Sequence, residues 1–141
     1  MKQFVKVLML ALVGAGTWVA TADSSAAMMN NNDRIWDALT VQGNLTLKGK
    51  YKESPENGRV EQQLEVELQH LQPGTVVAVT IDGMTVRNMT ANSMGVARLN
   101  VRKVVPPGPD GRPTGPRVND GSILAATWGG QSLSATFIPR P

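Results

Sequence analysis

The sequence predicts an all-β protein, either an antiparallel β-sandwich or a partly closed barrel of about seven strands. Over residues 41–138, apolar and polar residues alternate with a period of two, as they do in strands with one buried face. Gly, Pro, Asn and Asp separate these segments at short intervals, and helical spacing is almost absent. We therefore predict a single domain over residues 41–138.

Residues 1–22 have the pattern of a secretory signal peptide. Lys2 and Lys6 flank the start of an apolar run from Phe4 to Val19, and Ala20-Thr21-Ala22 has the small residues of a cleavage site. The run of about 16 residues is shorter than the ~20 apolar residues of a membrane-spanning helix. We expect cleavage after Ala22, or else at Ser25-Ala26-Ala27, and no membrane span in the mature chain. The alternative is an uncleaved membrane anchor.

Charge and cysteine content narrow the partners and the compartment. The chain has 14 Lys and Arg against 11 Asp and Glu, and two of the basic residues lie in the signal peptide, so the mature net charge is +1. This balance argues against nucleic acid, because phosphate binding needs clustered Lys and Arg. Cysteine is absent, which excludes disulfides and thiolate metal sites. We expect a bacterial protein of the periplasm or the cell exterior.

A polar lead-in occupies residues 23–40. Its first part, residues 23–33, has no periodicity, so we expect disorder there. Asp33 is a suitable helix cap, and Ile35 and Leu39 are four residues apart. These features predict a helix of one to two turns at most.

The first predicted hairpin spans residues 41–68. Alternation over residues 41–52 puts odd-numbered residues on a buried face and lysines in water, and the turn Pro55-Glu56-Asn57-Gly58 leads to a second alternating run. Only registers that pair odd with even positions keep both apolar sets inside. In such a register we expect Lys50 opposite or diagonal to Glu61, on a solvated charged face.

A second hairpin is predicted around Asp82-Gly83, whose residue types suit a two-residue turn. The preceding run, Thr75 to Ile81, is apolar at both parities and fits the interior of a sheet. The register counted outward from the turn pairs Ile81 with Met84, Thr80 with Thr85, and Val79 with Val86.

One more strand and a hairpin complete the prediction. After a turn at residues 92–95, the run from Val96 to Val101 alternates as a strand, and the last hairpin turns at Gly129-Gly130. Its register pairs Ala126 with Leu133, Leu124 with Ala135, and Ser122 with Phe137.

The segment from Pro106 to Gly121 is predicted to be a long loop, because it holds five Pro and four Gly in sixteen residues. We found no large apolar anchor in it and expect an exposed, mobile excursion. Arg112 and Arg117 would then be available to an acidic partner. The alternative is a solvated spacer with no partner.

No catalytic constellation is found in the sequence. His70 is the single histidine and lies at a predicted strand end, which is an ordinary place for a polar residue. We see no phosphate-binding loop, no calcium loop and no set of metal ligands, so we expect no enzyme activity, no metal and no cofactor.

Three aromatic residues are candidates for a binding surface: Trp36, Tyr51 and Trp128. Aromatic faces stack on sugar rings, so a carbohydrate-binding module is one hypothesis. The other is that Tyr51 and Trp128 fill the core, since both share parity with apolar neighbours. Trp36, in the lead-in, is expected to be the freer tryptophan and to dock across an open end of the sandwich.

The order of several short motifs resembles small uncharacterised β-domains of exported proteins from environmental bacteria. The motifs are Leu64-Glu-Val66-Glu-Leu68, Leu71-x-Pro73-Gly74-Thr75, Val79-Thr80-Ile81-Asp82-Gly83, Gly95-x-Ala97-x-Leu99, and Gly121-Ser122 to Ala135-Thr136-Phe137. The resemblance covers about Gly43 to Phe137 and implies fold and export, but no activity. The leading hypothesis is an exported, non-catalytic β-sandwich that serves as an interaction or structural module.

Overall fold

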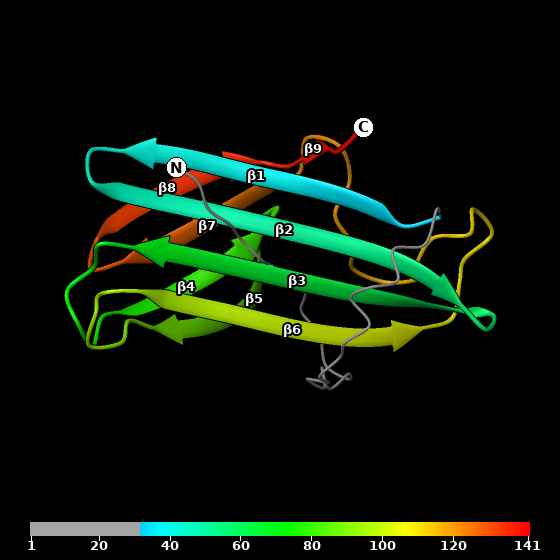
Figure 1. Ribbon diagram of the computed structural model, residues 1–141, viewed down its shortest axis with the longest axis horizontal. Coiled ribbons are helices and arrows are strands. Elements are labelled where there is room, and N and C mark those ends of the chain that lie inside the picture. The colour runs from blue at the N-terminus through cyan, green and yellow to red at the C-terminus, as the bar shows by residue number, and fades with distance from the viewer. Residues whose placement is uncertain (1–31) are drawn as a thin grey trace.

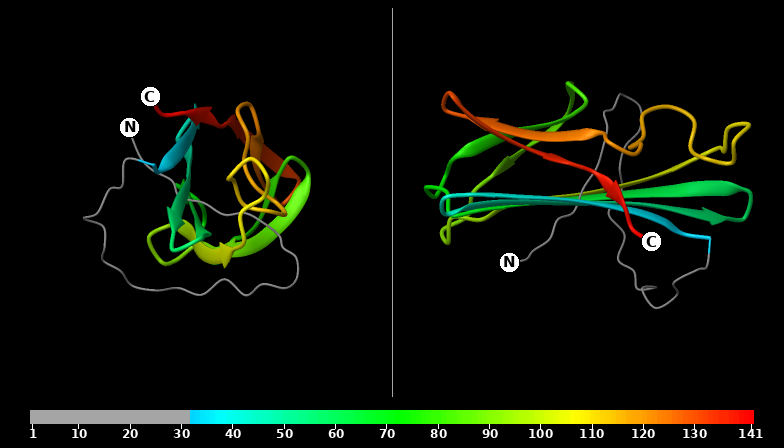
Figure 2. Two further views of the ribbon diagram at one scale, coloured as in Figure 1. Left: turned by 90° about the vertical axis from the view of Figure 1, so that its right-hand side faces the viewer. Right: turned by 90° about the horizontal axis from the view of Figure 1, so that it is seen from above.

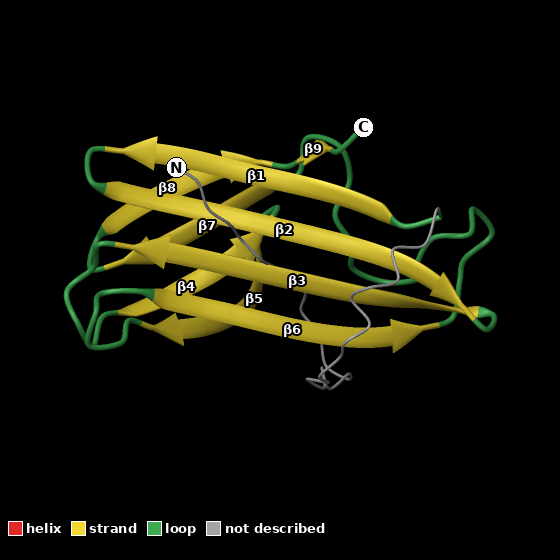
Figure 3. Ribbon diagram, viewed as in Figure 1, coloured by secondary structure: helices red, strands yellow, loops and turns green. Residues whose placement is uncertain are grey.

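The computed structural model describes residues 32–141, which form two antiparallel sheets packed face to face (Figures 1 and 3). Sheet A has the strand order β6-β3-β2-β1-β9, and sheet B has the order β5-β4-β7-β8. The strands are β1 (Arg34–Gln42), β2 (Leu45–Glu56), β3 (Arg59–Gln69), β4 (Val76–Ile81), β5 (Met84–Thr90), β6 (Ala97–Val105), β7 (Ile123–Trp128), β8 (Gln131–Thr136) and β9 (Ile138–Pro139). No helix capable of spanning a membrane occurs in this part of the chain. The predicted sandwich is confirmed, while the predicted signal peptide, residues 1–22, and the first half of the lead-in, residues 23–31, lie outside the described residues.

The core lies between the inner faces of the two sheets. Alternate residues of most strands, including β3, β4 and β6, point inward, as the period of two predicts. The largest fully buried side chains come from both sheets: Tyr51, Phe137, Leu47, Leu64, Leu68, Leu124 and Gln62. One of these, Gln62, is polar, and it belongs to the network described below.

The helix expected after Asp33 is wrong, because the segment forms strand β1. All nine residues of β1 pair with β2, and Trp36 and Ala38, two residues apart, both point into the core. Ile35 and Leu39 have helical spacing but point away from the core. The domain therefore begins at Arg34 and not at residue 41.

The long first strand predicted over residues 41–52 is also wrong. Gly43, with a φ of +62°, forms a tight turn between β1 and β2. Val41 lies before this turn and is 53% exposed. The odd-numbered residues Leu47 and Tyr51 are buried, as predicted.

The hairpin of β2 and β3 has the predicted parity but a different register. Lys50 lies opposite Glu65 and not Glu61. The turn is made by Asn57 and Gly58 alone, with φ values of +52° and +75°, so both strands extend further toward it than expected. Because the turn is shorter than predicted, each residue of β2 pairs with a residue further along β3 than expected.

Sheet B follows the predicted hairpins closely. Strand β4 is interior, between β5 and β7, and Ile81 pairs with Met84 as expected. Val79 pairs with Arg87 and not with Val86, because the register shifts at a β-bulge next to Thr80. The last hairpin has the predicted pairs of Leu124 with Ala135 and Ala126 with Leu133.

The loop after β6 crosses one end of the sandwich to reach β7 (Figure 2). Within it, Pro107 and Pro113 form a short bridge, and Val118 is completely buried. The prediction of an excursion without a buried anchor is therefore wrong. Val118 is small, but its position under the crossing makes it part of the core.

Candidate functional site

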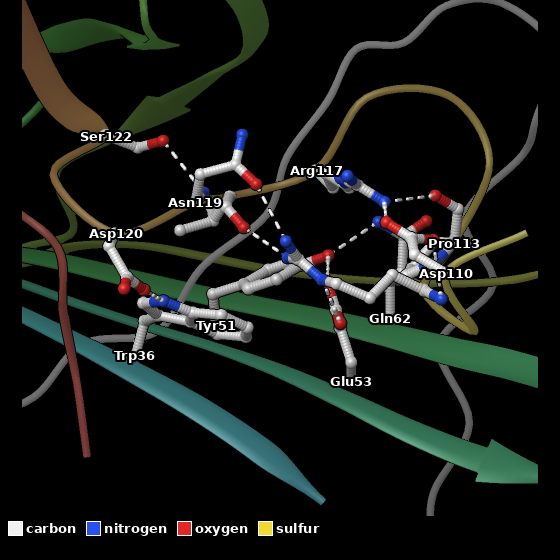
Figure 4. A network of polar contacts seen from close by, with 12 residues as sticks. Trp36, Tyr51, Glu53, Gln62, Asp110, Pro113, Arg117, Asn119, Asp120 and Ser122 are labelled. Atoms are coloured by element: carbon white, nitrogen blue, oxygen red, sulfur yellow. Dashed lines mark hydrogen bonds and ion pairs between the residues drawn. The ribbon is translucent and has the colours of Figure 1, made fainter. Parts of the chain in front are cut away.

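Polar side chains gather beneath the crossing loop (Figure 4). Tyr51 and Glu53 lie on β2 and share the inward parity of their strand, and Gln62 lies on β3 directly opposite Glu53. All three are buried, so their polar atoms need partners within the protein. The loop supplies several of these partners.

The strongest contact of this polar network joins Arg112 in the loop to Glu53. Arg112 donates from Nε to Glu53 Oε1 at 3.0 Å and from Nη2 to Glu53 Oε2 at 2.7 Å. The two side chains are 12% and 3% exposed. Paired N–H···O bonds between ionised groups are among the stronger hydrogen bonds in proteins. Burial alone would lower the pKa of Arg112, but the bonds to Glu53 and its negative charge raise it overall.

The same guanidinium fixes the far side of the loop. Arg112 Nη1 donates to Asn119 Oδ1 at 2.7 Å, and Nη2 also donates to the carbonyl oxygen of Val118. The backbone N–H of Asn119 in turn donates to Ser122 Oγ at 2.9 Å, next to the start of β7. Arg112, in the middle of the loop, is thus bonded both to β2 and to the end of the loop at Val118 and Asn119.

Tyr51 completes the buried part of the network. Its hydroxyl donates to Glu53 Oε2 at 2.7 Å and accepts from Gln62 Nε2 at 2.8 Å. Gln62 Nε2 also donates to the carbonyl oxygen of Pro116 at 2.9 Å. Burial, and after it the negative charge of Glu53, raises the pKa of Tyr51 well above its ordinary value. The phenol therefore stays protonated and acts as a fixed hydrogen-bond donor.

Trp36 is buried, not free. Its Nε1 donates to Asp120 Oδ1 at 2.7 Å, its ring centroid lies 5.5 Å from that of Tyr51, and Arg112 Cζ lies 4.8 Å from the ring centroid. Trp36 is 5% exposed and Tyr51 is not exposed at all, so neither ring offers a face to a sugar. Trp128 is half-buried against the core. The prediction that Trp36 is the freer of the two tryptophans is wrong, because Trp128 is the more exposed one.

The two candidate arginines of the loop have different surroundings. Arg112 is committed to Glu53, and the expectation that it faces an outside partner is wrong. Arg117 lies nearer the surface, where its Nη1 is 3.0 Å from Asp110 Oδ2. The backbone N–H of Arg112, followed by Arg117, lowers the pKa of Asp110.

A hollow of about 360 Å³ lies beside the network. Asp33 is its least satisfied residue: the side chain is 4% exposed, Oδ2 is 3.7 Å from Lys52 Nζ, and Oδ1 has no hydrogen-bond partner. Sequence reasoning missed this hollow, because Asp33 was interpreted as a helix cap. The residues lining it are Asn32, Asp33, Arg34, Glu53, Pro55, Val60 and Gly111.

No group of three or more metal-binding side chains is found in residues 32–141. His70, the single histidine, is exposed at the end of β3 with a φ of +72°, a backbone conformation that suits the turn there. Neither observation adds a catalytic group to the polar network.

The outer faces of the two sheets differ in charge. Sheet A carries lysines on β2, glutamates on β3 and arginines on β6, and these include the ion pairs Arg98–Glu67 and Arg102–Glu61. The outward residues of β4, β7 and β8 include no charged side chain; we call them the neutral face. Its members are Val76, Ala78, Thr80, Ile123, Ala125, Thr127, Ser132, Ser134 and Thr136.

Comparison with known proteins does not assign the chain to a family. No protein-family model matches the chain, and no curated protein matches it. The resemblance to small exported bacterial β-domains stays a prediction.

Proposed function

We propose that the protein is an exported, non-catalytic β-sandwich that acts as an interaction or structural module in the periplasm or outside the cell. The observation that carries this proposal is the neutral face of sheet B, which is rich in hydroxyl groups and is formed by exposed and half-buried residues. The buried polar side chains beneath the crossing loop are, by contrast, engaged with one another.

The polar network supports a structural role for the buried charges. General acid–base catalysis needs a group that can exchange a proton with a substrate. Both oxygens of Glu53 already accept hydrogen bonds, from Tyr51 and Arg112, and the guanidinium of Arg112 is spread over three partners. These groups hold the loop against the sheets.

The neutral face suits an uncharged partner surface, such as a protein or a glycan. Ser and Thr hydroxyls can both donate and accept hydrogen bonds, and no charge has to be desolvated when they are covered. Nucleic acid is a poor fit for this face, because phosphate contacts require Lys and Arg.

Export is tested by expressing the full chain in a bacterium and sequencing the N-terminus of the purified protein. We expect a mature chain that begins at Asp23, or at Met28 if the second site is used, in the periplasm or the medium. A Leu10→Arg variant, which interrupts the apolar run, should remain in the cytosol. Recovery of the wild-type chain in the cytosol with Met1 intact would contradict export.

The interaction role is tested with a photo-crosslinking amino acid on the neutral face. Thr127 on β7 is the test position, and Asn100, exposed on the charged outer face of sheet A, is the matched control. We expect defined crosslinked products from position 127 in intact cells and none from position 100. Equal labelling at both positions would mean that the neutral face has no specific partner.

A further inference from the structure

The hollow beside the polar network lies at the end of the sandwich where β1 begins and β2 ends (Figure 1). Val60 at the start of β3 and Gly111 of the crossing loop also line it. Its volume of about 360 Å³ falls in the ~300–1,000 Å³ range of small-molecule sites. A ligand held there must match the charged groups of the wall, because burying a charge without a partner is costly.

Asp33 gives this hollow a hydrogen-bond acceptor that lacks a donor. Its side chain is 4% exposed, and Oδ1 has no hydrogen-bond partner. The cation beside it, Lys52 Nζ, is 3.7 Å from Oδ2, which is longer than the ~2.7–3.2 Å of an N–H···O bond. Buried side-chain oxygens are normally bonded. The soft torsion about the Cβ–Cγ bond of Asp33 allows the carboxylate to offer an oxygen to a donor in the hollow.

Arg34, the next residue, gives the same hollow a cation that lacks an anion. It is exposed at the first position of β1, and none of the ion pairs found within residues 32–141 includes it. Glu53 lies opposite Arg34 in the ladder, but its carboxylate is already bonded to Arg112 and Tyr51. A guanidinium binds a carboxylate through two parallel hydrogen bonds. The hollow therefore offers a ligand one negative and one positive group.

We propose that the hollow binds a small zwitterion, an amino acid, with its ammonium group on Asp33 and its carboxylate on Arg34. A simple amine would leave Arg34 unpaired, and a simple carboxylate would leave Asp33 without a donor. The apolar part of the wall is limited to Pro55 and Val60, so a short side chain fits best. The site is separate from the neutral face and goes beyond the proposed function, which does not depend on it.

Other occupants match the wall less well. Calcium takes six to eight oxygen ligands, and no group of three or more metal-binding side chains is found in the part of the chain that the structure describes. A phosphate or another simple anion would meet Arg34 but would also lie beside the carboxylates of Asp33 and Glu53. The paired charges of an amino acid avoid both conflicts.

Saturation-transfer NMR on the purified protein tests the proposal with a mixture of the twenty standard amino acids. We expect transfer to at least one amino acid with a short side chain, and none to propylamine or propionate at the same concentration. Transfer to no amino acid would mean that the hollow holds water alone and would overturn the proposal. Transfer to propylamine as strong as that to the best-bound amino acid would also overturn it, because Arg34 would then play no part.

Variants of the two charged residues locate the site. Asp33→Asn keeps the size of the side chain and removes its charge, so it should weaken binding of the best-bound amino acid by ~10-fold or more. Arg34→Gln should weaken binding to a similar degree. Asp37→Asn and Arg59→Gln are the matched controls, at positions that do not line the hollow, and should bind like the wild type. Wild-type affinity in both Asp33→Asn and Arg34→Gln would place the amino acid elsewhere and overturn the proposal.

Thermal unfolding separates a binding role of Asp33 from a structural one. Because the carboxylate lacks a donor in the free protein, Asp33→Asn should melt without ligand at the same temperature as the wild type or higher. The amino acid should raise the melting temperature of the wild type and not that of the variant. A variant that melts lower without ligand and still binds the amino acid would show that Asp33 serves only as the partner of Lys52, against the proposal. Such a result would leave crosslinking from the neutral face, and with it the proposed function, unaffected.

Discussion

Glu53 and Asp110 are both carboxylates paired with an arginine of the loop, but their surroundings make the two pairs unequal. Glu53 is 2% exposed, and an unpaired charge at such a position is costly because water cannot solvate it. Asp110 is at the surface, where water solvates it whether or not Arg117 is present. The contribution of each arginine to stability should follow the burial of its partner.

Replacing Arg112 with leucine should destabilise the fold by about 3 kcal/mol, the range expected when one partner of a buried pair is removed. Glu53 would keep only the hydrogen bond from Tyr51. Arg117→Leu is the control from the same loop and should leave the free energy of unfolding nearly unchanged. Urea denaturation of both variants measures the difference. Equal losses would show that Glu53 is solvated in the folded protein.

Tyr51 should resist ionisation as long as the protein is folded. Its folded-state pKa is raised above the ordinary value of 10.0, so its stabilising effect is complete below that pH and is lost as the pH rises beyond it. Tyr51 is the single tyrosine, so tyrosinate absorbance reports on it alone. We expect that absorbance to appear only as the protein unfolds in alkali.

The matching control is Tyr51→Phe, which removes the ionising group together with two hydrogen bonds. The substitution should lower the free energy of unfolding by about 1 kcal/mol per lost bond at neutral pH. As the pH rises into the alkaline range, the variant should then lose less stability than the wild type. Tyrosinate absorbance that rises with an ordinary midpoint in the folded wild type would show that water reaches the phenol.

At the scale of elements, β2 packs tightly at Gly49 against Leu124 of β7 and against Phe137. A Cβ atom built on Gly49 would lie 2.6 Å from Leu124 Cδ2 and 3.1 Å from Phe137 Cζ. Gly49 is therefore needed for space and not for an unusual backbone angle. Its absent side chain sets how closely the layers pack at this point.

Gly49→Ala should destabilise the protein by about 1–3 kcal/mol, because it overpacks the contact between the sheets. Leu124→Val shortens the nearest side chain and should recover part of that loss when the two substitutions are combined. Thermal or urea unfolding of both single variants and the double variant gives the coupling. Strictly additive effects would mean that the sheets simply move apart to make room.

Alternation and turn chemistry predicted most of this architecture from local residues. The hairpins at Asp82-Gly83 and Gly129-Gly130 were found because two-residue turns fix their own register. Strand β1 was missed because the inward residues Trp36 and Ala38 share their segment with a helical spacing, and only pairing with β2 decides between the two. The bulge beside Thr80 cannot be recognised from the alternation of apolar and polar residues in the sequence.

The polar network could be predicted only in part. Glu53 continues the buried parity of Leu47 and Tyr51, so the sequence does indicate a carboxylate that needs a cation. Its partner lies 59 residues further along the chain, in a loop without periodicity. Local sequence patterns cannot indicate whether Arg112 or Arg117 pairs with Glu53, since the pairing depends on how the loop crosses the sandwich.

At the scale of the whole molecule, the crossing loop closes one end of the space between the sheets (Figure 2). It begins at the end of β6, an edge of sheet A, and must reach β7 in the interior of sheet B. On the way it places Val118 in the core and Arg112 on Glu53. The loop is therefore a third structural part of the sandwich besides its two layers.

Replacing Asp110–Arg117 with a Gly-Ser segment of the same length tests this role, because connectivity is kept while the contacts are removed. We expect a loss of at least ~3 kcal/mol, the cost of leaving Glu53 without Arg112. Arg112→Leu alone should cause most of this loss, since the replaced segment contains Arg112 and the main contact is the one that it makes with Glu53. Unchanged melting of the replaced chain, with loss of a bound partner in pull-down, would instead favour a loop that serves recognition. A large loss of stability that Arg112→Leu alone reproduces would establish that this arginine joins the loop to the two sheets.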